Sequence, residues 1–391
     1  MLTRARALAA GGVACLVAIA LAGCGSGSSS SASQTAVTVS GGTLAIFLSE
    51  PADVTSDPAA RDVVDAERLA FAADRGAVAD FHLQLIARAA AKLSDNARAA
   101  ILDPRTIAYV GEIAPGTSDQ TVGITNALDV LELSPTDTAL ELTNQTPAVS
   151  GAPHFYYESW STYGQTFARM VPSGLREAKA LVAQMRSLHA GSLYVASDGS
   201  DYGRALADAL AADARAAGLA AARSESAAGA IFYGAQSPTA AARFFDRAAA
   251  LAPHARLFGS SSLDSAAFTA ALSPAAAARL YVSLPGFMPR ALTPAGRAFV
   301  ARFRAAYGHT PNPEAIFGYA AVADLLGVLH RLGREANNRT AVIRALLSQR
   351  RVSSVLGTFS MQSSGNTTLD AFVFARVRDG RLVPVAAAPT A

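Results

Sequence analysis

The strongest constraint on the fold is a pair of short apolar runs, Ile107–Val110 and Val130–Leu133. The segment between them contains Thr121–Leu128, which is long enough for a short crossover helix. Two strands that are apolar throughout, joined through a helix, are typical of a parallel βαβ unit buried on both faces. In such sheets a ligand binds beyond the carboxyl ends of the strands, where helix N-termini present free N–H groups. The two runs therefore predict an α/β fold with a binding site at this sheet edge.

Small, hydroxyl-bearing residues follow both apolar runs, in Gly116–Ser118 after the first and Ser134–Thr138 after the second. Two such clusters at adjacent strand ends are expected to form half of a polar binding site. The candidate ligand contacts from this half are Thr117, Ser118, Ser134, Thr136 and Thr138. Ser, Thr and Pro also end strands and cap helices, and the spacing alone leaves both interpretations open.

Residues 1–23 have the pattern of an export signal. Two arginines precede an apolar segment, Ala7–Ala22, that is too short for a comfortable membrane span. The small residues that lead to Cys24 resemble a bacterial lipobox, so we expect a lipoprotein signal peptide and a lipidated Cys24. An ordinary secretory signal with an incidental Cys24 is the alternative. Residues 24–42 are rich in Ser, Gly and Thr and are expected to form a flexible tether to the cell membrane.

Charge and motifs exclude several classes of function. The formal net charge is only +3 over 391 residues, and the arginines are scattered without a basic block, which argues against a nucleic-acid partner. Beyond the signal the sequence has no G-x-S-x-G, Walker A, HExxH or CxxC motif, so we expect neither an enzyme nor a bound cofactor. The six histidines stand far apart, without the spacing of metal ligands.

Two helices of the chain have clear start signals. Thr293, followed by a proline, predicts a helix that ends at Gly308 and buries its aromatic side chains in the core. Asp201 is the predicted N-cap of another helix, which runs to Ala217 and is followed by Gly218. Further alternation of strand-like and helix-like segments begins at Thr43 and starts again after residue 174, which favours two α/β units.

Five segments carry a family resemblance when they are taken in order. They are IAYVGE…LSPTDTALELT from residue 107, SLYVASDGSDYGRALADAL from 192, AIFYGAQSPTAAARFF from 230, ARFRAAYGHTPNPEAIFGYAAV from 301 and SVLGTFSMQSSGNTTL from 354. Together they resemble type 1 periplasmic binding proteins, in particular the Leu/Ile/Val-binding family of ABC-transporter solute receptors. The resemblance covers the chain from about Gly42 to its C-terminus.

The resemblance implies two Rossmann-like lobes, each a mostly parallel sheet flanked by helices, joined by three hinge crossovers. Lobe I is expected to comprise residues 43–171 and 286–354, and lobe II residues 172–285 and 355–391. The expected crossovers lie near Met170–Ser173, Leu284–Gly286 and Val355–Phe359.

The resemblance also implies which side chains hold the ligand. In the family, hydroxyl and backbone groups after the second strand hold the α-carboxylate and amine, and Ser134, Thr136 and Thr138 match that motif. Thr138 is the expected side-chain contact. Tyr202 matches a tyrosine that lines the second-lobe side of the cleft, and Gln236 and Ser261 occupy further cleft positions.

Two departures from the family bear on the ligand. Pro115 stands where the family has a serine, and Ser261 stands where amino-acid receptors carry the acid that neutralises the ligand's ammonium. Because a buried ammonium without a counter-charge costs several kcal/mol, we expect a neutral amide, or an acid without an ammonium. The alternative is that Asp264 or Asp137 supplies the charge after the cleft closes.

The resemblance predicts a monomeric, lipid-anchored extracytoplasmic solute receptor that serves an ABC permease of the branched-chain amino acid type. Its ligand would be a small polar molecule, such as an amino acid, an amide or a related carboxylate. A ligand sensor that feeds a signalling partner and a degenerate receptor with an altered site remain the alternatives.

Overall fold

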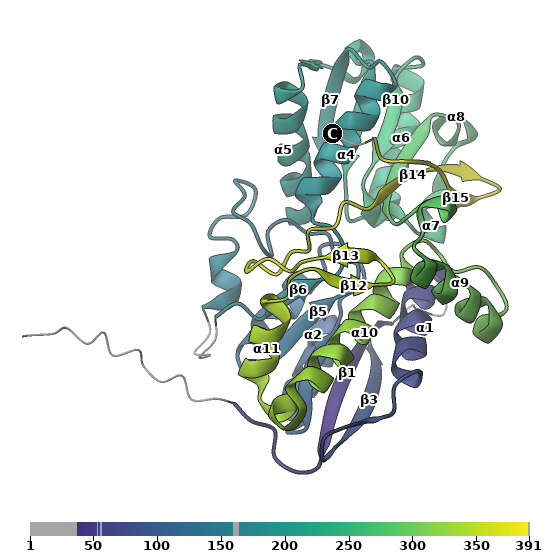
Figure 1. Cartoon of the computed structure of the whole chain (residues 1–391). Helices are drawn as coiled ribbons and strands as arrows, with labels where there is room; N and C mark the ends of the chain where they lie inside the picture. Colours follow the sequence, from purple (N-terminus) through teal and green to yellow (C-terminus); the bar gives the residue numbers. More distant parts are fainter. Residues whose placement is uncertain (1–36, 53, 55–56, 159–163, 390–391) are drawn as a thin grey trace, which may run out of the picture. The chain divides into compact units, whose positions relative to one another are not determined.

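The computed structural model describes residues 37–52, 54, 57–158 and 164–389 (Figure 1). The predicted signal peptide and Cys24 lie outside the described residues. The last part of the predicted tether is attached to the fold: Val39 is buried and its N–H donates to the carbonyl of Asn337 (2.8 Å). The N–H of Arg339 donates in turn to the carbonyl of Val37 (2.9 Å). Any free tether therefore ends before Val37, because the chain from that residue onward is paired with the 337–339 segment.

Lobe I is defined here by the six-stranded sheet β2-β3-β1-β4-β5-β6. Its strands are β1 (Thr43–Pro51), β2 (Ala77–Val78), β3 (Phe81–Ala90), β4 (Thr106–Val110), β5 (Leu131–Ser134) and β6 (Phe167–Arg169). All neighbours pair in parallel except β2 with β3. The helices of this part are α1 (Pro58–Ala72), α2 (Leu93–Leu102), α3 (Val122–Asn126), α9 (Pro294–Tyr307), α10 (Ala315–Leu332) and α11 (Arg339–Leu347). The buried βαβ unit predicted from the two apolar runs is present as β4, α3 and β5.

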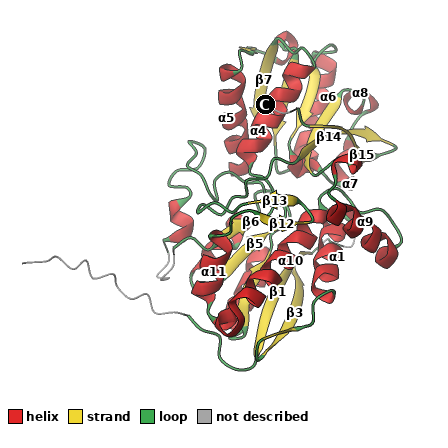
Figure 2. Cartoon of the chain, in the orientation of Figure 1, coloured by secondary structure: helices red, strands yellow, loops and turns green. Residues whose placement is uncertain are grey.

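Lobe II is defined by the seven-stranded sheet β15-β14-β11-β10-β9-β7-β8. Its strands are β7 (Ser192–Ser197), β8 (Ala220–Ala221), β9 (Ala230–Gly234), β10 (Arg256–Gly259), β11 (Leu280–Pro285), β14 (Phe372–Arg378) and β15 (Arg381–Ala387). Its helices are α4 (Gly174–Ser187), α5 (Asp201–Ala216), α6 (Pro238–Leu251), α7 (Ala266–Ala271) and α8 (Pro274–Ala277). Helices flank both sheets, as Figure 2 shows, so the predicted fold class of two α/β lobes is confirmed.

Three crossovers connect the two sheets. The first lies between β6 and α4, and the second follows β11. The third lies at Ala371–Phe372, later than the predicted Val355–Phe359. The reason is packing: the hairpin of β12 (Val352–Ser354) and β13 (Gly357–Phe359) buries Phe359 in the lobe I core, and Ala371 still belongs to that core.

The helix start signals have a physical counterpart in the structure. Thr293 Oγ1 accepts the N–H of Gly296 (2.9 Å), and Gly308 ends α9 at φ +81°. The cap of α5 is Ser200 and not Asp201, because Ser200 Oγ accepts the N–H of Gly203 (3.1 Å). Asp201 instead pairs with an arginine on the surface of the helix.

The segment Ala315–Asn337, which contains α10, is long and apolar enough to cross a membrane by length and composition. It lies in the lobe I core, and 72% of its most apolar window is buried inside the protein. A helix that is apolar on all sides and covered by protein is the central helix of a globular core. This burial accounts for the composition of α10.

Candidate functional site

The cleft between the two sheets is bridged by hydroxyl groups from both. Thr138 follows β5 in lobe I, and its Oγ1 lies 3.2 Å from Oγ of Ser261, which follows β10 in lobe II. The hydroxyl of Tyr202, in the first turn of α5, lies 3.4 Å from the same Ser261 oxygen. All three side chains are buried. The structure therefore brings together three of the predicted site residues.

Gln236 makes a second bridge across the cleft. Its Nε2 donates to the carbonyl of Gly116 (2.9 Å), in the loop after β4. Gly116 has φ +82°, and a Cβ there would lie 2.2 Å from Gln236 Nε2 and 2.8 Å from Tyr202 Cβ. Only glycine allows this close approach, because both the backbone conformation and the space exclude a side chain.

The other four predicted residues make contacts within lobe I. Ser134 Oγ donates to the carbonyl of Glu112 (2.7 Å), and Thr136 Oγ1 donates to that of Ile113 (2.6 Å). Ser118 Oγ accepts the N–H of Glu112 (3.3 Å), and Thr117 Oγ1 donates to the carbonyl of Ala114 (2.5 Å). The hydroxyl groups of Ser134 and Thr136 tie the loop after β5 to the loop after β4, whereas those of Thr117 and Ser118 bond within the loop after β4.

Asp137 is held within the same pair of loops. One carboxylate oxygen accepts the N–H groups of Gly116 (2.7 Å) and Ala139 (2.9 Å), and the other accepts that of Ser118 (2.9 Å). Three backbone donors leave this buried carboxylate fully engaged. Asp137 is one of the two candidates for a displaced counter-charge. Its carboxylate is already hydrogen-bonded to the backbone of the loops after β4 and β5.

The carboxylate nearest the hydroxyl cluster belongs to Glu177 on α4, which the sequence analysis missed. It accepts the N–H of Ser261 (2.7 Å), the hydroxyl of Ser261 (3.1 Å) and the hydroxyl of Ser283 (2.6 Å). Burial raises the pKa of Glu177, although these donors oppose the rise. Position 261 itself lacks the acid that the family carries there. Glu177, 84 residues earlier in the chain, brings a carboxylate into contact with Ser261 instead. A glutamate in the first turn of a helix has an ordinary capping explanation, so the sequence gives no signal for this role.

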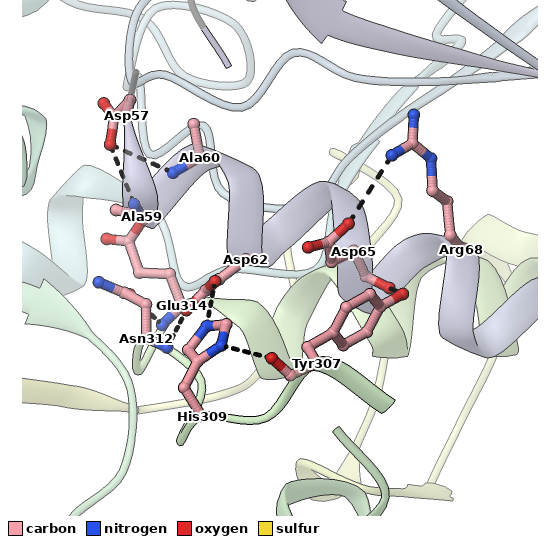
Figure 3. Close-up of polar contacts among 10 residues, drawn as sticks. All are labelled: Asp57, Ala59, Ala60, Asp62, Asp65, Arg68, Tyr307, His309, Asn312 and Glu314. Atoms are coloured by element: carbon pink, nitrogen blue, oxygen red, sulfur yellow. Dashed lines mark hydrogen bonds and ion pairs between the residues drawn. The ribbon is translucent and has the colours of Figure 1, made fainter. Parts of the chain in front are cut away.

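A cavity of about 250 Å³ lies beside the hydroxyl cluster. Its walls include Ile113–Pro115 from lobe I and Gln236, Ser261 and Asp264 from lobe II. Asp57 and Glu314, at the starts of α1 and α10, also line it (Figure 3). Among the described residues that line it, none is Lys, Arg or His.

Asp264 is the second candidate for a displaced counter-charge, and it does line the cavity. Its Oδ2 accepts a hydrogen bond from Nδ2 of Asn312 (3.0 Å), which joins lobe II to the loop before α10. Burial raises the pKa of Asp264 to about 6. Within the described part of the chain, no group of His, Cys, Asp and Glu residues is arranged to hold a metal ion.

Comparisons with known proteins agree with this architecture. Residues 219–381 match a family model described as periplasmic binding protein. A leucine-binding protein of Thermotoga maritima superposes with a TM-score of 0.71 at 17% identity, over 88% of this chain and 98% of that one. The fold is that of a type 1 periplasmic binding protein.

Other proteins with this periplasmic binding protein fold are similar to the same extent. An ABC transporter substrate-binding protein of Desulfitobacterium hafniense in complex with Leu has a TM-score of 0.68 and 20% identity, over 88% of this chain and all of that one. A solute-binding protein of an R. palustris ABC transporter in complex with benzoate has a TM-score of 0.65 and 16% identity, over 89% of this chain and 96% of that one. Comparison with curated proteins gives no match. The chain therefore shares its fold with substrate-binding proteins of ABC transporters.

Proposed function

We propose that this chain is an extracytoplasmic, lipid-anchored solute-binding protein of an ABC importer of the branched-chain amino acid type. Its ligand is a small polar molecule that enters the cleft between the lobes. Bound ligand draws the lobes together, and the closed form is what the membrane permease recognises. The protein performs no chemistry on the ligand.

The observation that carries this proposal is the meeting of polar groups from both sheets beside a cavity. Thr138 of lobe I contacts Ser261 of lobe II at 3.2 Å, and Gln236 reaches the carbonyl of Gly116 at 2.9 Å. Each bridge follows the carboxyl end of a parallel strand, where α/β folds bind ligands. The neighbouring cavity of about 250 Å³ is smaller than the roughly 300–1,000 Å³ of drug-sized ligand sites, which suits a small solute.

A thermal-shift screen of the purified, processed protein tests the proposal. The panel contains amino acids, their amides, small carboxylates and small amines. A ligand present at one hundred times its dissociation constant adds about 2.7 kcal/mol to the free energy of unfolding, so a true ligand raises the melting temperature clearly. If no compound of the panel stabilises the protein at millimolar concentration, the proposed function is wrong.

A pair of threonine variants localises the site once a ligand is found. Thr138→Val removes the hydroxyl that faces lobe II, and affinity should fall by roughly 1–3 kcal/mol, the usual cost of an unsatisfied buried partner. Thr117→Val makes the same chemical change at a hydroxyl that contacts only its own loop, and affinity should hold. Equal affinities of the two variants in calorimetry would move the site away from the cleft.

A further inference from the structure

Glu314 is a buried carboxyl group that faces the cavity, and no residue in the described part of the chain pairs with it. Its side chain is 7% exposed and lines the space beside Asp57 and Ala59 (Figure 3). Its backbone N–H donates to Oδ1 of Asn312 (2.9 Å), but its carboxylate makes no hydrogen bond or ion pair with any described residue. Glu177, close by, has three donors. A buried carboxyl group without such a partner is costly to ionise, and a cation in the cavity would offset that cost.

The cavity around Glu314 is acidic. Asp264 lines it from lobe II, and Asp57 lines it at the start of α1, where its side chain accepts the N–H groups of Ala59 (3.0 Å) and Ala60 (3.4 Å). Burial raises the pKa of Glu314 well above its ordinary value, and the charges of Asp264 and Asp57 raise it further. A positive group in this space would lower the cost of all three carboxylates at once.

A carboxylate ligand has no cationic partner among the described residues of this wall, where the polar donors are the neutral side chains of Gln236, Ser261, Ser262 and Ser265. No basic side chain is present among the described residues of the wall, and Pro115 has no N–H to offer. The backbone donors of the neighbouring loop, Gly116 and Ser118, are occupied by Asp137. Much of the remaining wall is apolar, from the side chains of Ile113, Ala60, Ala114, Pro238, Ala266 and Ala267.

We propose that the solute bound in this cavity is a small amine that carries no carboxylate, with its ammonium group held by Glu314 of lobe I and Asp264 of lobe II and its short apolar body against the alanine and isoleucine wall. This rests on the proposed function, because it names the ligand class of the same cleft. An ammonium that touches one carboxylate from each lobe also links ligand binding to closure, since it interacts with both acids at once only when the lobes are together.

Four compounds with one branched aliphatic body separate the ligand classes. Isoamylamine and leucinamide are cations without a carboxylate, leucine is a zwitterion, and 4-methylpentanoate is an anion. Calorimetric titration of the processed protein should show binding of the two cations, with leucine and 4-methylpentanoate at least tenfold weaker.

Two glutamate variants then test the contact. Glu314→Gln should weaken the binding of both cations at least tenfold. Glu67→Gln is the matched control, because Glu67 is also fully buried and its carboxylate atoms have no partner among the residues that the structure describes, yet it does not line the cavity. Cation affinity should be unchanged in this control. Thermal melting of each unliganded variant verifies that it is folded.

The outcomes distinguish this inference from the proposed function. If leucine or 4-methylpentanoate binds more tightly than the cations, or if Glu314→Gln leaves cation binding intact, the amine assignment is wrong while a solute-binding function stands. A ligand from the wider thermal-shift panel that has no positive charge would also overturn it. If nothing in either set stabilises the protein, the proposed function fails as well.

Discussion

Replacing Glu112 by glutamine should flatten the pH dependence of stability, because Glu112 is a buried acid of lobe I. It follows β4 and is fully buried. Its carboxylate accepts hydrogen bonds from the hydroxyl of Ser49 (2.9 Å) and from that of Tyr109. Burial nevertheless outweighs these donors and raises the pKa of Glu112 from 4.5 to about 7.

The sign of the effect follows from the two pKa values. Between pH 4.5 and 7 the folded protein keeps a proton that the unfolded chain has released. The stabilisation from Glu112 is therefore complete below pH 4.5 and is lost as the pH rises through 7. At about 1.4 kcal/mol per pKa unit, the total loss is about 3 kcal/mol, of which about 2.5 kcal/mol falls between pH 5 and pH 8.

Urea denaturation of wild type and Glu112→Gln at pH 5 and pH 8 measures this. Glutamine cannot ionise, and like the protonated acid it has both donor and acceptor capacity, so the hydroxyl partners can stay in place. The difference in unfolding free energy between the two proteins should change by about 2.5 kcal/mol in favour of the variant at pH 8. Glu141, a buried acid with a pKa of about 7 that is not shifted by Glu112, titrates in both proteins and cancels. The exposed Glu335→Gln is the control. A difference that is the same at both pH values would refute the reasoning.

Three further expectations concern the anchor, the cleft and the first lobe. Cys24→Ala should release the protein from the membrane, and mass spectrometry of a wild-type protein without lipid would contradict this. Gly116→Ala should block the approach of Gln236 and lower the melting temperature of the unliganded protein, whereas an unchanged melting curve would show that the loop yields. His309 Nε2 lies 2.9 Å from Asp62, and this hydrogen bond raises the pKa of the histidine. The stabilisation from this hydrogen bond is complete below pH 6.5 and is lost as the pH rises through the raised pKa of His309. In thermal melts, His309→Gln should therefore lower the stability more at pH 5.5 than at pH 9.

Much of the fold could be predicted because its signals are local. The apolar runs at Ile107–Val110 and Val130–Leu133 became β4 and β5, and Thr293 with its following proline began α9. The third crossover was misplaced because the hairpin at residues 352–359 has no feature that assigns it to one lobe. Phe359 packs into the lobe I core and so places the hairpin in lobe I. The sequence pattern does not show which core a side chain packs against.

Contacts within the candidate site could be predicted only where a residue's position depends on the end of its own strand. Thr138 and Ser261 each follow a strand, so their meeting follows from the fold. Ser134 and Thr136 follow the same strand, yet their hydroxyl groups turn back to carbonyls of the loop after β4. The direction of the side chain decides whether a hydroxyl group faces the cleft or bonds to the neighbouring loop. The spacing of residues in the sequence does not predict that direction.

The acidic residues of the cleft could not be predicted from the sequence motif around position 261. The serine at position 261 suggested a cleft without an acid, and from this we expected a ligand without an ammonium. The structure has Glu177 in contact with that serine and Glu314 facing the neighbouring cavity, from helices that begin 87 residues before it and 54 after it. Glu177 is satisfied by three donors, so it can remain buried in the absence of a ligand. Glu314 has no such donors among the described residues and, unlike the equally buried Glu67, it lines the cavity, where a solute can reach its carboxylate.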